Sequence, residues 1–322
     1  MKEITLTDIR DKMKKEQRAL TLKKFTSNKL FISGAIIVLF VTMLAILAPI
    51  FISYGPYEMT VEDRLKGPSS QHLFGTDNLG RDLFARVVYG ARVSLMVGLS
   101  VAITTSVVGM IIGLLASYYK TLDHILMRIC DGLMAIPGIL FAIALMAALG
   151  PSTNNVIIAL SIVFTPHIAR IVRSRALSVQ EETYIEAIRA QGARPMRIIF
   201  LHIAPNAVSP LIVQATFIFA ESIITEAALS FLGAGVPTPN PSWGNILYDG
   251  KLVIFNAWWM TLFPGIMLII TIIGLNFLGD GFRDAIDPHL KPIFKKRVRL
   301  LKIFVPKKKT IKNQNETINT QS

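Results

Sequence analysis

Two glutamates, Glu221 and Glu226, are the only charged residues in the long apolar run from Val208 to Leu232. An ionisable side chain at membrane depth is costly unless it faces water or other protein groups, so each is a candidate pore or gate residue. At five residues apart they do not share one face of a helix and do not form a paired acid–base site. For Glu226 two interpretations stand side by side, a pore-lining group and a helix-packing hydrogen bond.

No combination of residues in the chain supports catalysis, metal binding or nucleotide binding. The only Gly-Lys pair, Gly250-Lys251, has Asn245 and Leu252 where a phosphate-binding loop needs glycine and a hydroxyl residue. There is no His-Glu-x-x-His pattern, no cysteine pair and no Gly-x-Ser-x-Gly pattern. The single cysteine, Cys130, is interpreted as an ordinary helix residue. We therefore expect no catalytic residue, no metal site and no cofactor bound by this chain.

The composition is typical of a membrane protein. Hydrophobic residues make up 52% of the 322 residues and charged residues 17%, with a formal net charge of +13 and a mean hydropathy of +0.51. The basic residues lie in the two terminal segments and a few short loops, and are not interleaved with aromatic residues as in a nucleic-acid groove. This excludes nucleic acid as the partner and favours contact with membrane lipid at the charged ends.

Apolar runs of about 20 residues are long enough for a helix to cross a bilayer. The turn-forming residues 150–155 divide the uncharged stretch from Gly132 to Ala169 into two passes. The sequence therefore predicts an all-α, polytopic membrane protein with six transmembrane helices. They run from Phe31 to Ile52, Ser94 to Tyr118, Ile129 to Leu149, Val156 to Val172, Val208 to Leu232 and Ala257 to Gly279.

The distribution of lysine and arginine predicts the orientation. Nine precede Phe31, two join the second and third passes, six lie in 170–197, and eleven follow Gly279. All four groups fall on one face of a six-pass protein, which the positive-inside rule places in the cytoplasm with both termini. The predicted layout is a basic segment 1–30, a first span 31–52, an outer-face segment 53–93, a five-helix core 94–280 and a basic tail 281–322.

The cytoplasmic segment between the fourth and fifth passes predicts a helix-turn-helix. A short helix from Glu181 to Ala190 is followed by Gly192, and a second helix restarts near Pro195. Glycine commonly follows a helix end, and proline is tolerated in a first helical turn. Such a bent pair at the mouth of a membrane bundle is suited to receive a mechanical push.

The same segment resembles the EAA loop of ABC importer permeases. The resemblance rests on Glu186-Ala187, on Gly192 five residues after Ala187, and on Pro205 thirteen residues further on, with Tyr184 and His202 in the flanking positions. Ile188 stands where alanine is usual and Ala204 where leucine is frequent, and both are mild departures. The resemblance implies that the short helix docks into a cytoplasmic ATPase subunit.

Six further segments resemble the C-type membrane subunit of the dipeptide, oligopeptide and nickel permease family, from about Phe25 to Lys291. They are His72–Asp82, Tyr89–Leu95, Met127–Asp131, Glu226–Gly233, Pro241–Gly244 and Gly279–Pro288. The resemblance implies a prokaryotic plasma-membrane protein paired with a homologous B-type permease. It also implies two ATPase subunits that hold ATP and Mg²⁺, and an extracellular or periplasmic substrate-binding protein.

The resemblance implies peptides as cargo, with nickel or a metal chelate as the alternative. A stand-alone secondary transporter is the alternative from another class, and a membrane enzyme is the weakest interpretation because no catalytic cluster exists. The inverted repeats and charges on several spans that secondary transporters commonly show are not evident here.

Turn-forming residues on the outer face have two interpretations. The first is a packed cap without ligand contact, and the second is a surface that meets the binding protein. The prolines of 237–241 rule out a regular helix there and predict an ordered outer loop anchored by an interfacial tryptophan. The outer-face candidates are Gly75, Thr76, Asp77, Gly80, Arg81, Asp82 and Trp243.

Overall fold

The computed structural model describes residues 16, 24–52 and 54–286, and within these residues the chain is helical and contains no strand. The all-α class predicted from the sequence is confirmed. Most of the basic segment 1–30 and of the tail 281–322 lies outside the described residues, so the expectations for these two segments stay predictions.

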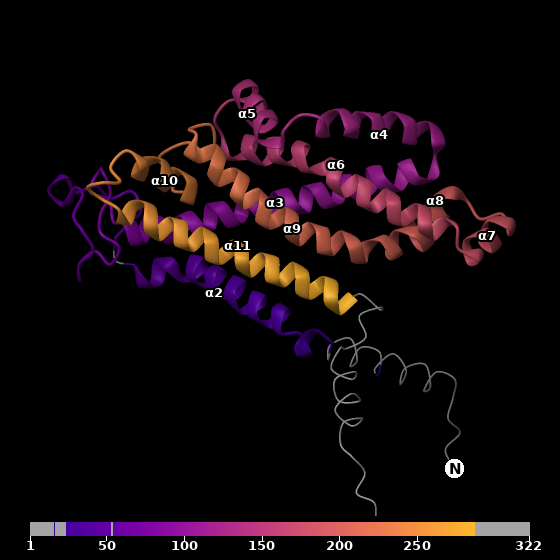
Figure 1. Ribbon diagram of the computed structural model, residues 1–322, viewed down its shortest axis with the longest axis horizontal. Helices are drawn as coiled ribbons and strands as arrows, with labels where there is room; N and C mark the ends of the chain where they lie inside the picture. Colours follow the sequence, from indigo (N-terminus) through magenta and orange to yellow (C-terminus); the bar gives the residue numbers. More distant parts are fainter. Residues whose placement is uncertain (1–15, 17–23, 53, 287–322) are drawn as a thin grey trace, which may run out of the picture. The chain divides into compact units, whose positions relative to one another are not determined.

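Five helices are long and apolar enough to cross a membrane (Figure 1). At a rise of 1.5 Å per residue, each of these helices is long enough to cross a hydrocarbon layer of about 30 Å. The helices are α2 (Lys29–Phe51), α3 (Leu83–Tyr118), α6 (Thr153–Gln180), α9 (Ala204–Phe231) and α11 (Trp259–Ile286).

The predicted third pass is not one straight helix. It is built from α4 (Lys120–Met134) and α5 (Gly138–Leu149), which meet at an angle of 95°. The break falls at Pro137, which precedes the first residue of α5 and cannot donate a backbone hydrogen bond to continue α4. The six-pass count therefore holds only if α4 and α5 together make one bent pass.

Among the five helices named above, the two span boundaries that differ most from the prediction are the start of the second span and the end of the fourth. The second span begins at Leu83 and not at Ser94, because Asp82 caps its first turn by accepting from the amide of Ala85 at 2.7 Å. The fourth runs on to Gln180 and not to Val172, with Pro166 inside the helix. This helix thus continues at its C-terminal end beyond its apolar run.

The long helix α3 packs against both α6 and α9, while α2 packs against α11. Two glycines allow α3 and α6 to approach closely. A methyl group on Gly109 would lie 2.6 Å from Cβ of Ile168, and one on Gly113 would lie 2.6 Å from the carbonyl oxygen of Ala169. Small residues at such contacts are typical of helix packing within membranes.

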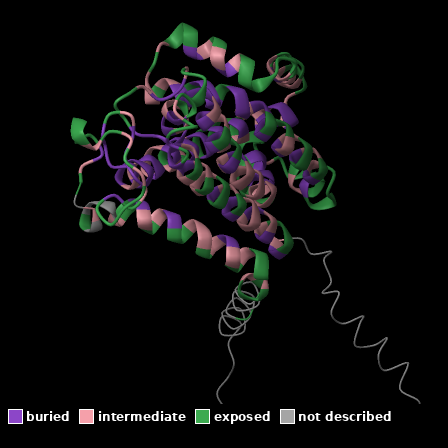
Figure 2. Cartoon of the chain, turned by 60° about the vertical axis from the view of Figure 1, so that its left-hand side comes forward, coloured by how far each residue is buried: buried purple, intermediate pink, exposed green. Residues whose placement is uncertain are grey.

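Burial divides the helices into central and peripheral ones (Figure 2). The central helices contribute fully buried residues such as Leu160 and Ile168 of α6. The peripheral helix α2 exposes Ile36, Leu39 and Phe40 by 61%, 62% and 61%. Exposed aliphatic and aromatic side chains along a spanning helix are what contact with lipid requires.

Short elements complete the described chain between the spans. A 3₁₀ turn, η1 (Val61–Asp63), lies in the outer-face segment. Between α6 and α9 the chain forms α7 (Thr183–Ala190), α8 (Pro195–Arg197) and the π-helical turn η2 (Ile198–Ile203), which leads into α9. The predicted outer loop between α9 and α11 contains a helix, α10 (Trp243–Lys251).

Candidate functional site

The segment between α6 and α9 has the predicted helix-turn-helix form. Helix α7 begins at Thr183, two residues after the expected start, and the chain turns at Gly192, whose φ is +78°. The Gly192 amide donates to the carbonyl oxygen of Arg189 at 3.0 Å. A side chain there would meet no atom within 4 Å, so the left-handed backbone and not the lack of space calls for glycine. The helix restarts at Pro195 as predicted.

One residue fixes α7 to the body of the protein. Ile185 is fully buried, whereas its neighbours Tyr184, Glu186 and Ala187 are exposed. Ile185 belongs to the hydrophobic cluster formed by α3, α6 and the start of α9, and Ile188 packs partly against the same cluster. Helix α7 is therefore anchored on one side and presents acidic and small residues on the other.

The remaining residues of the segment connect α7 with the start of α9. The side-chain amide of Asn206 donates to the Tyr184 hydroxyl at 3.3 Å and to the His202 carbonyl at 2.7 Å. Pro205 lies in the first turn of α9 and is exposed. Asn206 thus links Tyr184 with His202, two of the six residues that the sequence picked out for this segment. We call residues 181–206 the coupling segment.

The C-terminal end of α3 contacts both the coupling segment and the residue that precedes it. The Gln180 side-chain amide donates to the carbonyl oxygen of Ser117 at 3.0 Å, and the guanidinium of Arg189 lies 5.7 Å from the ring centroid of Tyr118. A movement of α7 would therefore displace residues of α3 and α6 as well as of α9.

A largely buried group of four charged residues joins the segment before α3, α3 itself and α10. Asp77 Oδ2 accepts from Arg81 Nε at 2.6 Å and from Arg86 Nη1 at 2.5 Å, and Asp249 of α10 lies 3.5 Å and 3.3 Å from the two arginines. Asp77 and Arg86 are fully buried. Two guanidinium and two carboxylate groups balance in formal charge, which is what burial of ions requires. Among the described residues, Nε and Nη2 of Arg86 have no partner.

The other predicted outer residues fold around this group. Thr76 donates from its hydroxyl to the Asp63 carbonyl and receives the Lys66 amide at 2.8 Å, while His72 lies 2.9 Å from Asp82. Gly75 and Gly80 have φ of +78° and +75°. A hydrogen bond from Lys66 lowers the pKa of the partly buried Asp63 carboxyl. We call residues 60–82 the outer cap; it is packed, and both sequence interpretations of its role stay open.

The sequence predicts that Trp243 is an interfacial anchor, but its side chain is enclosed by the protein. Its side chain is 0% exposed, and its indole Nε1 donates to the carbonyl oxygen of Val87 at 3.0 Å. It is the first residue of α10 and packs against α3, so it anchors this helix inside the protein. The exposed tryptophan is Trp258, at 52%.

The two glutamates of α9 occupy different surroundings. Glu221 is exposed, and Glu226 is 0% exposed and accepts hydrogen bonds from serine hydroxyls. In this conformation Glu226 has the geometry of a helix-packing residue. Glu221 retains the exposure that a pore residue needs.

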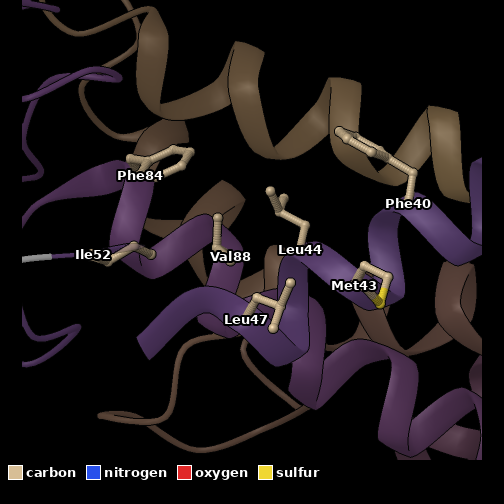
Figure 3. A pocket seen from close by; sticks show the side chains of 7 residues that line it. All are labelled: Phe40, Met43, Leu44, Leu47, Ile52, Phe84 and Val88. Atoms are coloured by element: carbon tan, nitrogen blue, oxygen red, sulfur yellow. The ribbon is translucent and has the colours of Figure 1, made fainter. Parts of the chain in front are cut away.

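Two apolar hollows lie between helices. One of about 210 Å³ lies between α2 and α3 (Figure 3), and the second, of about 410 Å³, lies between α3, α4 and α6. The lining of the first has no hydrogen-bonding side chain and can accept only an apolar chain. It consists of Phe40, Met43, Leu44, Leu47, Ile52, Phe84 and Val88.

Sequence reasoning missed three residues of these sites. Ile185 was signalled by its helical spacing from Ile188. Arg86 and Asp249 were not signalled, because a pair separated by 163 residues is created by the fold alone. Among the described residues no group of three or more histidine, cysteine or acidic residues could hold a metal ion.

Comparison with known proteins gives matches over most of the chain. Residues 105–292 match the family model of the binding-protein-dependent transport system inner membrane component, and residues 17–68 match the N-terminal transmembrane domain of oligopeptide transport permease C. The dipeptide transport system permease protein DppC of Alkalihalophilus pseudofirmus is 46% identical over 270 residues, which are 84% of this chain and 89% of its own length.

A second relative and a solved structure agree with this match. The oligopeptide transport system permease protein OppC of Bacillus subtilis is 40% identical over 269 residues, or 83% of this chain and 88% of its own. The inward-facing MetNI methionine ABC transporter matches 63% of this chain and 97% of its own chain, with a TM-score of 0.53 and 24% identity. That similarity concerns the fold alone.

Proposed function

Because the chain belongs to the family of binding-protein-dependent transport system inner membrane components, we propose that it forms one half of the translocation pore of an ATP-driven importer for dipeptides or oligopeptides. The cargo is inferred from relatives that are named as dipeptide and oligopeptide permeases. The alternative cargo, nickel or a metal chelate, has no supporting observation among the described residues.

The coupling segment is the observation that carries the proposal. Helix α7 is held to the bundle by the fully buried Ile185 and presents Glu186 and Ala187 to the surroundings. A short helix that is anchored on one side and free on the other can receive a push and pass it to α6 and α9. The exposed face of α7, with Glu186 and Ala187, is therefore the surface that we assign to an ATPase subunit.

The proposed complex contains a homologous B-type permease, two ATPase subunits and a substrate-binding protein outside the cell. ATP and Mg²⁺ are held by the ATPase subunits, and this chain binds no cofactor and catalyses no reaction. Closure of the ATPase subunits moves α7, and the helices that it contacts transmit the movement to the passage between the two permeases. Substrate then meets the outer and inner faces in alternation.

We place the chain in the plasma membrane of a prokaryotic cell, with both termini and α7 in the cytoplasm. The support for this orientation is the concentration of lysine and arginine in 1–30, 170–197 and the tail after Gly279. The outer cap and α10 then face outward, where a binding protein can reach them.

The test of the coupling role uses one introduced cysteine and two kinds of membrane preparation. In a Cys130→Ala background, Glu186→Cys should resist a membrane-impermeant maleimide added to intact cells and react in inverted vesicles. Purification of the tagged chain in mild detergent should bring a nucleotide-hydrolysing subunit with it. Labelling of the introduced cysteine in intact cells, or purification without any such subunit, would contradict the proposal.

The cargo requires a separate experiment. A strain that lacks this gene should lose uptake of labelled dipeptide or of a longer peptide, and uptake should return with the gene. Loss of nickel uptake with normal peptide uptake would assign the alternative cargo. Uptake by the purified chain in vesicles without ATPase subunits would instead identify a secondary transporter.

A further inference from the structure

The carboxylate of Glu226 lies where three helices meet. Its Oε2 accepts from the Ser94 hydroxyl of α3 at 2.9 Å, and its Oε1 accepts from the Ser230 hydroxyl of α9 at 2.8 Å. Ser242, the N-cap residue of α10, follows in the same polar network through Asn245, whose backbone amide donates to the Ser242 hydroxyl. No part of Glu226 is exposed. A buried carboxylate without several donors would be strongly destabilising, so these hydroxyl groups are needed for its presence there.

The hydrogen bonds continue from Glu226 into the chain that follows α9. The Ser230 hydroxyl accepts the amide of Val236 at 3.0 Å, and the Val236 carbonyl accepts from the side chain of Asn245 at 2.9 Å. The amide of Asn245 in turn donates to the Ser242 hydroxyl at 3.2 Å. A circuit of polar groups that runs from Glu226 to Ser242 thus joins the end of α9, the turn after it and the first turn of α10.

Close packing leaves this circuit little freedom. A methyl group on Gly235 would lie 2.2 Å from the Ser230 hydroxyl, and one on Gly244 would lie 2.5 Å from the Ala227 carbonyl oxygen. The positive end of the α10 helix dipole also points toward its N-cap residue Ser242, which favours an acidic group nearby. The site therefore fits an acceptor of the size and shape of glutamate.

Helix α10 is held to α3 at two further points. Trp243 donates to the Val87 carbonyl at 3.0 Å, and Asp249 lies 3.3 Å from Arg86. Together with Ser94, these contacts lie along the first turns of α3. Glu226 is the member of this set that comes from α9, so it is the group that ties α9 to the pair formed by α3 and α10.

We propose that Glu226 is a positioning residue that fixes the outer ends of α3, α9 and α10 as one unit. The structural role of Glu226 does not depend on the proposed transport function. Its consequence does rest on that function: the three segments would move together when the outer side opens. The substrate does not touch Glu226, because the side chain is enclosed by protein. Glu221, exposed on the same helix, has no such role.

The test is hydrogen exchange on the full chain in lipid nanodiscs, which needs no transport partner. Glu226→Ala should raise exchange in peptides covering residues 234–246 by about tenfold, since the Ser230 hydroxyl that receives the Val236 amide loses its acceptor. Ser94→Ala should act at the same place by about threefold, because one of the donors is lost. Exchange in the coupling segment should not change.

Two further variants separate positioning from general damage. Glu226→Gln keeps the shape and one acceptor oxygen, so it should restore most of the protection that Glu226→Ala removes. Glu221→Ala is the matched control on the same helix and should leave residues 234–246 unaltered. Unchanged exchange in Glu226→Ala, no rescue by glutamine, or an increase spread evenly over all helices would overturn the proposal. None of these results depends on the identity of the cargo or on ATP-driven uptake.

Discussion

Arg92 of α3 donates from its Nε to the carbonyl oxygen of Ala45 in α2 at 2.5 Å. Four residues after Ala45 the chain has Pro49, which has no amide hydrogen to give to that carbonyl. Arg92 therefore supplies the donor that the helix lacks, and it also reaches the next carbonyl, that of Ile46, at 2.9 Å. A side chain of one spanning helix thus completes the backbone hydrogen bonding of another.

Replacement of Arg92 should loosen α2. Arg92→Met leaves the Ala45 carbonyl without a donor inside the membrane, at a cost of about 1–3 kcal/mol. Arg92→Lys keeps one charged donor but not the second contact, and should cost less. Thermal unfolding of the purified chain measures both variants, with the exposed Arg64→Met as control. Equal midpoints for the Arg92→Met and Arg64→Met proteins would show that the contact adds nothing.

At Gly192 the backbone and not the available space should decide which residues are tolerated. Gly192→Val forces a β-branched residue to a φ of +78°, at a cost of about 1–2 kcal/mol, and should strongly reduce ATP-driven uptake. Gly192→Asn should keep most uptake, since asparagine enters this region more easily. The membrane level of each variant is measured by immunoblot. Gly132→Ala is a control at a glycine that also has open space but an ordinary helical φ. Full uptake by Gly192→Val would refute this account.

Removal of Asp77 should lower the free energy of unfolding more than removal of Asp249. Asp77→Ala leaves Arg86 and Arg81 without their shortest contact and should lower the unfolding free energy by about 3–5 kcal/mol. Asp249→Ala removes contacts of 3.3 Å and 3.5 Å only, and should cost less. Chemical or thermal denaturation in detergent gives the comparison, with the exposed Glu58→Gln as reference. The decisive result is which variant loses more unfolding free energy. A larger loss in Asp249→Ala would mean that Asp249, and not Asp77, holds the arginines.

The single cysteine is a natural reporter for the contact of α4 with α6. Cys130 is 4% exposed, and Arg173 of α6 holds α4 through two hydrogen bonds to Asp123, at 2.5 Å and 2.6 Å. Arg173→Ala should therefore speed maleimide labelling of Cys130, by up to about fivefold for a partly exposed pair. Arg170→Ala breaks a pair whose side chains are 52% and 59% exposed and should have little effect. Similar rates in the two variants would count against the ion pair as the restraint.

The spans could be predicted because apolar length is a property of the local sequence. The start of α3 was missed for the same reason, since Arg86 and Arg92 interrupt the apolar run and are tolerated only through partners elsewhere in the chain. Asp249 lies 163 residues from Arg86, and no local pattern brings them together. Pro137 indicates a break between α4 and α5. The prediction of one continuous pass ignored it, because the apolar run is long enough to span a membrane.

The coupling segment was predictable down to its turn. Gly192 and Pro195 are local signals of a helix end and a helix start, and the structure has both. Trp243 could not be placed in the same way. Tryptophan in an outer loop is commonly interfacial, and only the fold shows that its indole reaches the backbone of Val87.

The burial of Trp243 has a spectroscopic consequence. The three tryptophans of the chain are Trp243, Trp258 and Trp259, and they are 0%, 52% and 7% exposed. All the indole fluorescence thus arises beside α10 and the start of α11, and a water-soluble quencher can reach chiefly one of the three emitters. Tryptophan emission from this protein therefore reports on the region of α10 and the start of α11, without any added dye.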